Sequence, residues 1–117
     1  MSKKRALVFG NNNYARGVQL SCCIQNARDI GAKLKTIGFE VDLDCDPSYA
    51  RMTQTIIDFQ EKIEHNDLVV FFFSGHGVGW KGQAYLIATD DKCIMEKPAM
   101  CEHHAVSVQK TLESMMA

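Results

Sequence analysis

The sequence predicts an α/β fold built as a three-layer sandwich, with a mostly parallel β-sheet between two layers of helices. Three observations indicate this fold class. Segments of strand character alternate with segments of helical period along the 117 residues, which is the order of a parallel sheet. Leu68–Phe73 is an unbroken apolar run, typical of a parallel strand buried on both faces. Phe39–Asp44 alternates apolar and acidic residues, which indicates an edge strand with one wet face.

The length and composition indicate one globular domain. Apolar residues make up 46% of the chain and charged residues 23%, and the net charge of −1 gives no reason to expect nucleic acid or an anionic membrane as a partner. No apolar run approaches the roughly 18 residues of a membrane span, and no signal-peptide stretch opens the chain. Five cysteines without a secretory signal predict reduced thiols and a cytoplasmic location.

The first strand and helix are expected at the amino-terminal end. A buried strand covers Arg5–Gly10, and an asparagine-rich loop follows it to about Ser21. Helical spacing predicts a helix over Cys23–Thr36, which Gly38 ends. The inward stripe of this helix is predicted to be Ile24, Ala27, Ile30, Leu34 and Ile37.

A second helix is expected after the edge strand. Asp46-Pro47-Ser48 has the turn and capping chemistry that opens a helix, here predicted over Tyr49–Glu64. Its buried stripe is predicted to be Met52, Ile56, Phe59 and Ile63.

The carboxyl-terminal third has weaker signals. Tyr85–Ile87 is a short apolar piece, and residues 90–104 have no clear period and are expected to form an irregular surface loop. A third helix is predicted over Ala105–Met116, with Val108, Leu112 and Met115 inward. A helix at the end of such a chain normally leads into another strand, so we expect a sheet that is incomplete at the C-terminus and a chain that is part of a longer domain.

The strand pattern also predicts where chemistry is located. Two continuous apolar strands belong together, so Arg5–Gly10 should lie beside Leu68–Ser74, with Phe39–Asp44 at the edge. Two glycines then present His76 at the carboxyl end of a strand, where open α/β sheets bind their ligands. We therefore expect His76 to be partly accessible and close to the loop Asn11–Tyr14, which follows the neighbouring strand.

At this point three stretches resemble a known family: Ala6–Tyr14, Leu20–Ala27 and Phe72–Gly77. They look like the large catalytic subunit of the caspase family, nearest to its paracaspase and metacaspase-like branches. The resemblance implies a caspase-like fold and a cysteine endopeptidase with a Cys–His dyad, acting on peptide or protein substrates without a cofactor. It assigns the catalytic histidine to His76 and an oxyanion-hole amide to Gly77. An imidazole that titrates near neutral pH suits the proton transfers, and a glycine amide is unobstructed by a side chain.

The nucleophile is the missing part. In caspases the histidine precedes the cysteine by about 50 residues, which points to about position 126. We therefore expect the chain to be a large-subunit domain that stops before the nucleophile strand. Cys23 and Cys22 stand at a predicted helix N-terminus, where a thiol pKa can fall, and they are the alternative nucleophiles. The alternative is that Cys22 and Cys23 have a structural role only, as small residues that pack the start of the helix.

The residues that the resemblance assigns to specificity depart from the family pattern. Metacaspase-like members have an acidic residue at the position of Asn26, where it recognises Arg or Lys before the scissile bond. Asn26 keeps hydrogen-bonding capacity without the charge, so a preference for basic residues does not carry over. Arg16 is the loop arginine available for the pattern of caspases proper, although its spacing fits poorly and a solvated loop cation is the alternative.

No metal site is predicted. The segment after His76 has no acidic insert, and Asp90-Asp91 alone offers too few oxygen ligands for calcium. A zinc site would need Cys93, Cys101 and His103-His104, but a paired Cys-x-x-Cys is missing.

Two other classes of function stay open. One is a catalytically inactive caspase-like module that binds partners, including association with a second caspase-like chain. The other is a nucleotide-binding domain with Gly10–Tyr14 as a phosphate loop. Neither Gly-x-Gly-x-x-Gly nor Gly-Lys-Ser/Thr occurs, which disfavours the nucleotide-binding domain.

Overall fold

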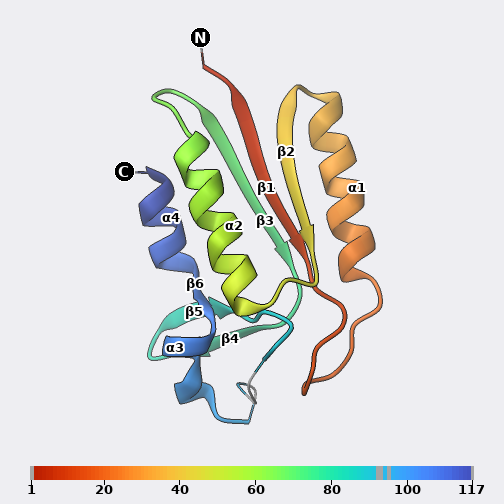
Figure 1. Cartoon of the computed structure of the whole chain (residues 1–117), viewed down its shortest axis with the longest axis vertical. Helices are drawn as coiled ribbons and strands as arrows, with labels where there is room; N and C mark the ends of the chain where they lie inside the picture. Colours follow the sequence, from red (N-terminus) through yellow and green to blue (C-terminus); the bar gives the residue numbers. More distant parts are fainter. Residues whose placement is uncertain (1, 92–93, 95, 117) are drawn as a thin grey trace.

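The computed structural model of the chain describes residues 2–91, 94 and 96–116, and Figure 1 shows its layers. The elements, in chain order, are β1 (Lys4–Gly10), α1 (Cys23–Thr36), β2 (Phe39–Cys45), α2 (Tyr49–Lys62), β3 (Leu68–Ser74), β4 (Gly77–Trp80), β5 (Gln83–Leu86), the 3-10 helix η1 (Pro98–Met100), α3 (Cys101–His104), β6 (Val106–Ser107) and α4 (Val108–Met116).

The main sheet is parallel with the strand order β2-β1-β3. This order confirms the predicted neighbours, since β1 lies between β3 and the strand of alternating acidic residues. The three strands end in register, because Gly10 pairs with both Cys45 and Ser74. Their carboxyl ends therefore form one edge, from which the candidate site is built.

The burial of β3 differs from the prediction. The apolar run was expected to be buried on both faces, but Leu68 is 55% exposed and the remaining residues of the strand are half-buried. Within the described part of the chain β3 pairs with β1 alone, so its second edge carries no strand. Helices cover the faces of β3 but not this edge, which explains the partial burial.

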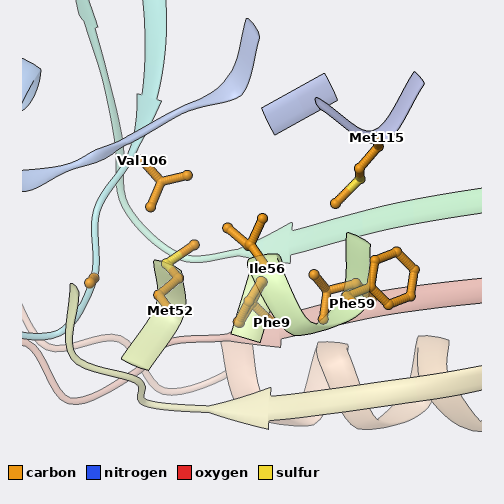
Figure 2. Close-up of a cluster of buried hydrophobic side chains, with 8 residues drawn as sticks. Phe9, Met52, Ile56, Phe59, Val106 and Met115 are labelled. Carbon is orange, nitrogen blue, oxygen red and sulfur yellow. The ribbon is translucent and has the colours of Figure 1, made fainter. Parts of the chain in front are cut away.

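Helices cover both faces of the sheet, which confirms the three-layer arrangement (Figure 1). On one face α1 packs against a cluster that includes Ala6, Val8 and Phe39. On the other face α2 and α4 cover Leu7 and Phe9. Figure 2 shows this second cluster, in which Met52, Ile56 and Phe59 of α2 meet Val106 and Met115 from the last part of the chain.

Helix α1 has the predicted bounds, and Gly38 follows it with a left-handed φ of +95°. Its stripe is narrower than predicted: Ala27 is fully buried, whereas Ile30 and Ile37 are 36% and 59% exposed.

Helix α2 begins as predicted, with the Ser48 side chain accepting a hydrogen bond from the Arg51 backbone N–H at 3.2 Å. It ends at Lys62 instead of Glu64. The predicted stripe is confirmed, because Met52, Ile56 and Phe59 are buried and Ile63 packs against them.

The carboxyl-terminal third contains a second sheet that the sequence did not predict. Strands β4, β5 and β6 form it in that order, all antiparallel. Lys81 and Gly82 form the two-residue turn between β4 and β5 with φ values of +50° and +76°, and the glycine supplies the second of these without strain.

The last helix starts later than expected. Val106 is extended and pairs with Leu86, so α4 begins at Val108 instead of Ala105. Its inward residues are Thr111 and Met115, while Leu112 is 40% exposed. The region predicted to be an irregular loop contains η1 and α3.

None of the described helices is long and apolar enough to cross a membrane.

Candidate active site at the carboxyl edge of the sheet

The structure places His76 where the sequence predicts it. The histidine lies between β3 and β4 and is half-buried, and the loop that follows β1 reaches over to it. The ring of Tyr14 lies 4.6 Å from the His76 ring, measured between centroids. This contact confirms the predicted placement beside the asparagine-rich loop.

The His76 ring is held by a backbone carbonyl. Its Nε2 lies 2.8 Å from the carbonyl oxygen of Val18. A carbonyl only accepts, so this bond requires the proton on Nε2 and leaves Nδ1 of the neutral ring as an acceptor. Val18 was not predicted to belong to the site, because a carbonyl contact depends on the path of the loop and every residue has a carbonyl.

The backbone of His76 is also fixed on both sides. Its carbonyl accepts from the Ile87 N–H at 3.0 Å, and its N–H donates to the Tyr14 hydroxyl at 2.8 Å. That hydroxyl donates in turn to the Ile87 carbonyl at 2.9 Å. Burial raises the pKa of Tyr14 to about 12, which keeps the phenol protonated and able to donate at neutral pH.

The Gly77 N–H is free to act as a donor by the geometry of the hairpin. Residues 76 and 87 form a hydrogen-bonded position of the antiparallel ladder, so the next pair, Gly77 and Leu86, is a non-hydrogen-bonded one. The Gly77 N–H therefore points away from β5. Gly77 is also exposed.

The two cysteines proposed as alternatives stand at the start of α1. The side-chain oxygen of Asn12 accepts from the N–H groups of Cys23 and Ile24, at 2.9 and 3.2 Å. This capping bond ties the helix start to the loop that carries Tyr14. No cysteine among the described residues is hydrogen-bonded to the His76 ring.

Asn26 lies beside the end of β3. Its side-chain amide donates to the hydroxyl of Ser74 at 3.4 Å, and Ser74 stands two residues before His76 in the chain. Asn26 is exposed and uncharged. Arg16 is exposed on the loop after β1, and its backbone N–H donates to the Asp91 carboxylate at 3.0 Å.

The acidic pair Asp90-Asp91 accepts hydrogen bonds from the backbone of other segments of the fold. Asp90 accepts from the Tyr49 N–H at 2.7 Å, and buried Asp91 accepts from Arg16 and from the Gly17 N–H, the latter at 2.6 Å. Among the described residues no group of three or more acidic, histidine or cysteine side chains is placed to hold a metal ion. Of the zinc candidates, Cys93 lies outside the described residues, and burial raises the pKa of the Cys101 thiol.

A hollow of about 500 Å³ lies between α2, α4 and the second sheet. Its lining includes Tyr49, Gln60, Lys110 and Ser114, and none of the residues that contact His76.

Comparison with known protein families gives one match, and it spans nearly the whole chain. The caspase domain matches residues 3–116. No curated protein matches at the stringency applied. A histidine at the strand end with an adjacent glycine amide, on a three-layer sandwich, agrees with that match, and the chain belongs to the caspase family of cysteine peptidases.

Proposed function

We propose that the chain is the histidine-bearing part of a cysteine endopeptidase, with His76 as general base and acid. The observation that carries this proposal is the bond from His76 Nε2 to the Val18 carbonyl. It orients the ring and leaves Nδ1 to receive a proton, as the third member of a hydrolase triad does for its histidine.

The chemistry then follows in two steps. Nδ1 takes the proton of a cysteine thiol, and the thiolate attacks the scissile carbonyl carbon while the Gly77 N–H donates to the developing oxyanion. The imidazolium returns its proton to the departing amine, which leaves a thioester. Water, deprotonated by the same histidine, attacks the thioester and releases the acid and the thiol.

We propose that the nucleophile is a cysteine supplied beyond residue 117. Among the described residues no strand pairs with the second edge of β3, which supports this proposal, because a further parallel strand there would end beside His76. Cys23 is the alternative within the chain, with exposed Cys22 next to it. The side-chain oxygen of Asn12 accepts from the Cys23 N–H and so caps the helix start at this residue.

For specificity, we propose that Asn26 contacts the substrate residue before the scissile bond and that it selects an uncharged or polar side chain. Its amide and the Ser74 hydroxyl present hydrogen-bonding groups without a net charge. Arg16 is a weaker candidate for substrate contact, because its backbone N–H is held by the Asp91 carboxylate.

The cysteines at positions 22, 23, 45 and 101 are free thiols, which supports a reducing compartment such as the cytoplasm. A protein substrate is the expected partner, and association with a second caspase-like chain is the other interaction that the family suggests.

A second function has an observation in its favour. Because no described cysteine is hydrogen-bonded to the His76 ring, the domain is also suited to a regulatory module that keeps the fold and binds partners without catalysis. Peptide turnover separates the two proposals.

The test is made in the chain extended by the sequence that follows it in its transcript. His76→Ala should lower kcat/KM on fluorogenic peptides by a factor of roughly 10³, within the range for a general acid–base group, with protein folding unchanged. His65→Ala is the matched control, since His65 is exposed in the turn before β3, at the opposite end of the sheet. Equal activity of His76→Ala and the control would contradict the proposed peptidase function.

A further inference from the structure

The Tyr14 hydroxyl occupies an unusual place in the second sheet. His76 and Ile87 face each other at a position where antiparallel residues normally exchange two hydrogen bonds. One of these is made directly, from the Ile87 N–H to the His76 carbonyl at 3.0 Å. The other is replaced by the hydroxyl, which accepts from the His76 N–H at 2.8 Å and donates to the Ile87 carbonyl at 2.9 Å.

The space for this hydroxyl is provided by Gly75. A Cβ at position 75 would lie 2.6 Å from the Tyr14 hydroxyl oxygen and 2.8 Å from a ring carbon of Phe73. Such distances are too short for real contacts, so a side chain at this position would displace the hydroxyl. The glycine before the histidine is thus required by the tyrosine.

Asn11 holds the second end of the bridge. Its side-chain amide donates to the same Ile87 carbonyl at 3.1 Å, and its backbone N–H donates to the Ser74 carbonyl at 2.9 Å. Both Asn11 and Tyr14 are buried. The bridge therefore joins the ends of β1, β3 and β5 around His76.

We propose that Tyr14 is a positioning residue for His76. Its hydroxyl fixes the peptide plane before the histidine and, with the ring contact at 4.6 Å, sets the direction in which the imidazole leaves the backbone. That direction brings Nε2 to the Val18 carbonyl. The importance of this ring orientation for catalysis rests on the proposed function, whereas the orientation of the His76 ring itself does not.

The test is nitrogen-15 NMR of the His76 ring in the 117-residue chain at alkaline pH. Wild-type protein should show mainly the tautomer protonated at Nε2. Tyr14→Phe keeps the aromatic ring and removes the hydroxyl, and should lower the ratio of the two tautomers about fivefold, the effect of one hydrogen bond.

Tyr85→Phe is the matched control. Tyr85 packs on the same apolar cluster as Tyr14, and its hydroxyl makes no hydrogen bond to the residues that the structure describes. The control should keep the wild-type ratio. An unchanged ratio in Tyr14→Phe, or an equal fall in both variants, would overturn the proposal.

Gly75→Ala gives a second route that leaves Tyr14 intact. The added methyl group displaces the hydroxyl, so this variant should reproduce the change seen in Tyr14→Phe, and a wild-type ratio in folded Gly75→Ala would contradict the proposal. In the wild-type chain the hydroxyl proton should exchange slowly with water, and fast exchange would also contradict it. None of these readouts uses a substrate, so absence of peptidase activity in the extended chain would overturn the proposed function and leave this result standing.

Discussion

His76 has two separable sets of contacts, one to its ring and one to its backbone. The ring bond to Val18 determines which nitrogen is available as a base. The backbone bonds to Tyr14 and Ile87 fix the main chain from which the imidazole extends. Val18 is itself 74% exposed, so the loop that carries it has little packing of its own at that point. The ring position therefore depends mainly on the buried backbone contacts.

Asn26 gives a prediction at the scale of a single residue. Asn26→Asp adds a negative charge beside Ser74 without changing the size of the side chain. A charge-assisted hydrogen bond exceeds a neutral one by about 1 kcal/mol, so we expect kcat/KM for peptides with Arg or Lys before the scissile bond to rise about fivefold relative to uncharged peptides. Peptide turnover in the extended chain measures this ratio.

Gln25→Glu is the control, because Gln25 is the neighbouring amide on α1 and donates to Asp29, along the exposed part of the helix. The same gain in both variants would show a general effect of charge and contradict the proposal that Asn26 contacts the substrate.

At the scale of elements, the amino end of the sheet is held by one carboxylate. Asp67 accepts from the Lys3 and Glu64 N–H groups and from Arg5 Nε, at 2.8 to 2.9 Å, and its side chain is 1% exposed. The two backbone N–H donors and the Arg5 guanidinium lower its pKa from 3.8 to about 2. The turn before β3 is thereby joined to β1.

This lowered pKa predicts the pH dependence of stability. The carboxylate stabilises the folded chain fully above its unfolded pKa of 3.8, and the contribution is lost as the pH falls toward about 2. Asp67→Asn should therefore lower Tm at pH 7, and the difference from wild type should shrink between pH 4 and pH 2, where thermal unfolding followed by circular dichroism measures it.

Asp58→Asn, on the exposed side of α2, is the matched control and should leave Tm nearly unchanged at every pH. A constant deficit for Asp67→Asn down to pH 2 would show that the carboxylate charge is not what joins the two strands.

The elements also show what the sequence could predict. Helix α1 and the stripe of α2 were found because helical spacing and caps are local signals. The β4–β5 hairpin was missed because its strands are four residues long and include two glycines, although Lys81-Gly82 is a turn signal. Thr111 replaces Leu112 in the core because Val106 is drawn into β6, a pairing that no local pattern indicates.

At the scale of the whole molecule, the topology brings the loops after β1, β2 and β3 to one edge, because the three parallel strands end in register. The loops after β1 and β3 come from neighbouring strands, which is why the neighbourhood of His76 could be predicted. The contacts that make the edge specific, through Val18, Asn11 and Ile87, could not be predicted. They depend on how the loops fold over one another and on backbone groups that every residue has.

The most direct test of the account compares fluorogenic peptide turnover by the 117-residue chain with turnover by the chain extended through its downstream sequence. We expect no useful turnover by the short chain, because no described thiol is hydrogen-bonded to the His76 ring, and turnover by the extended chain that His76→Ala abolishes. Turnover by the short chain that disappears in a Cys22→Ala, Cys23→Ala double variant would contradict the proposal that the nucleophile lies beyond residue 117.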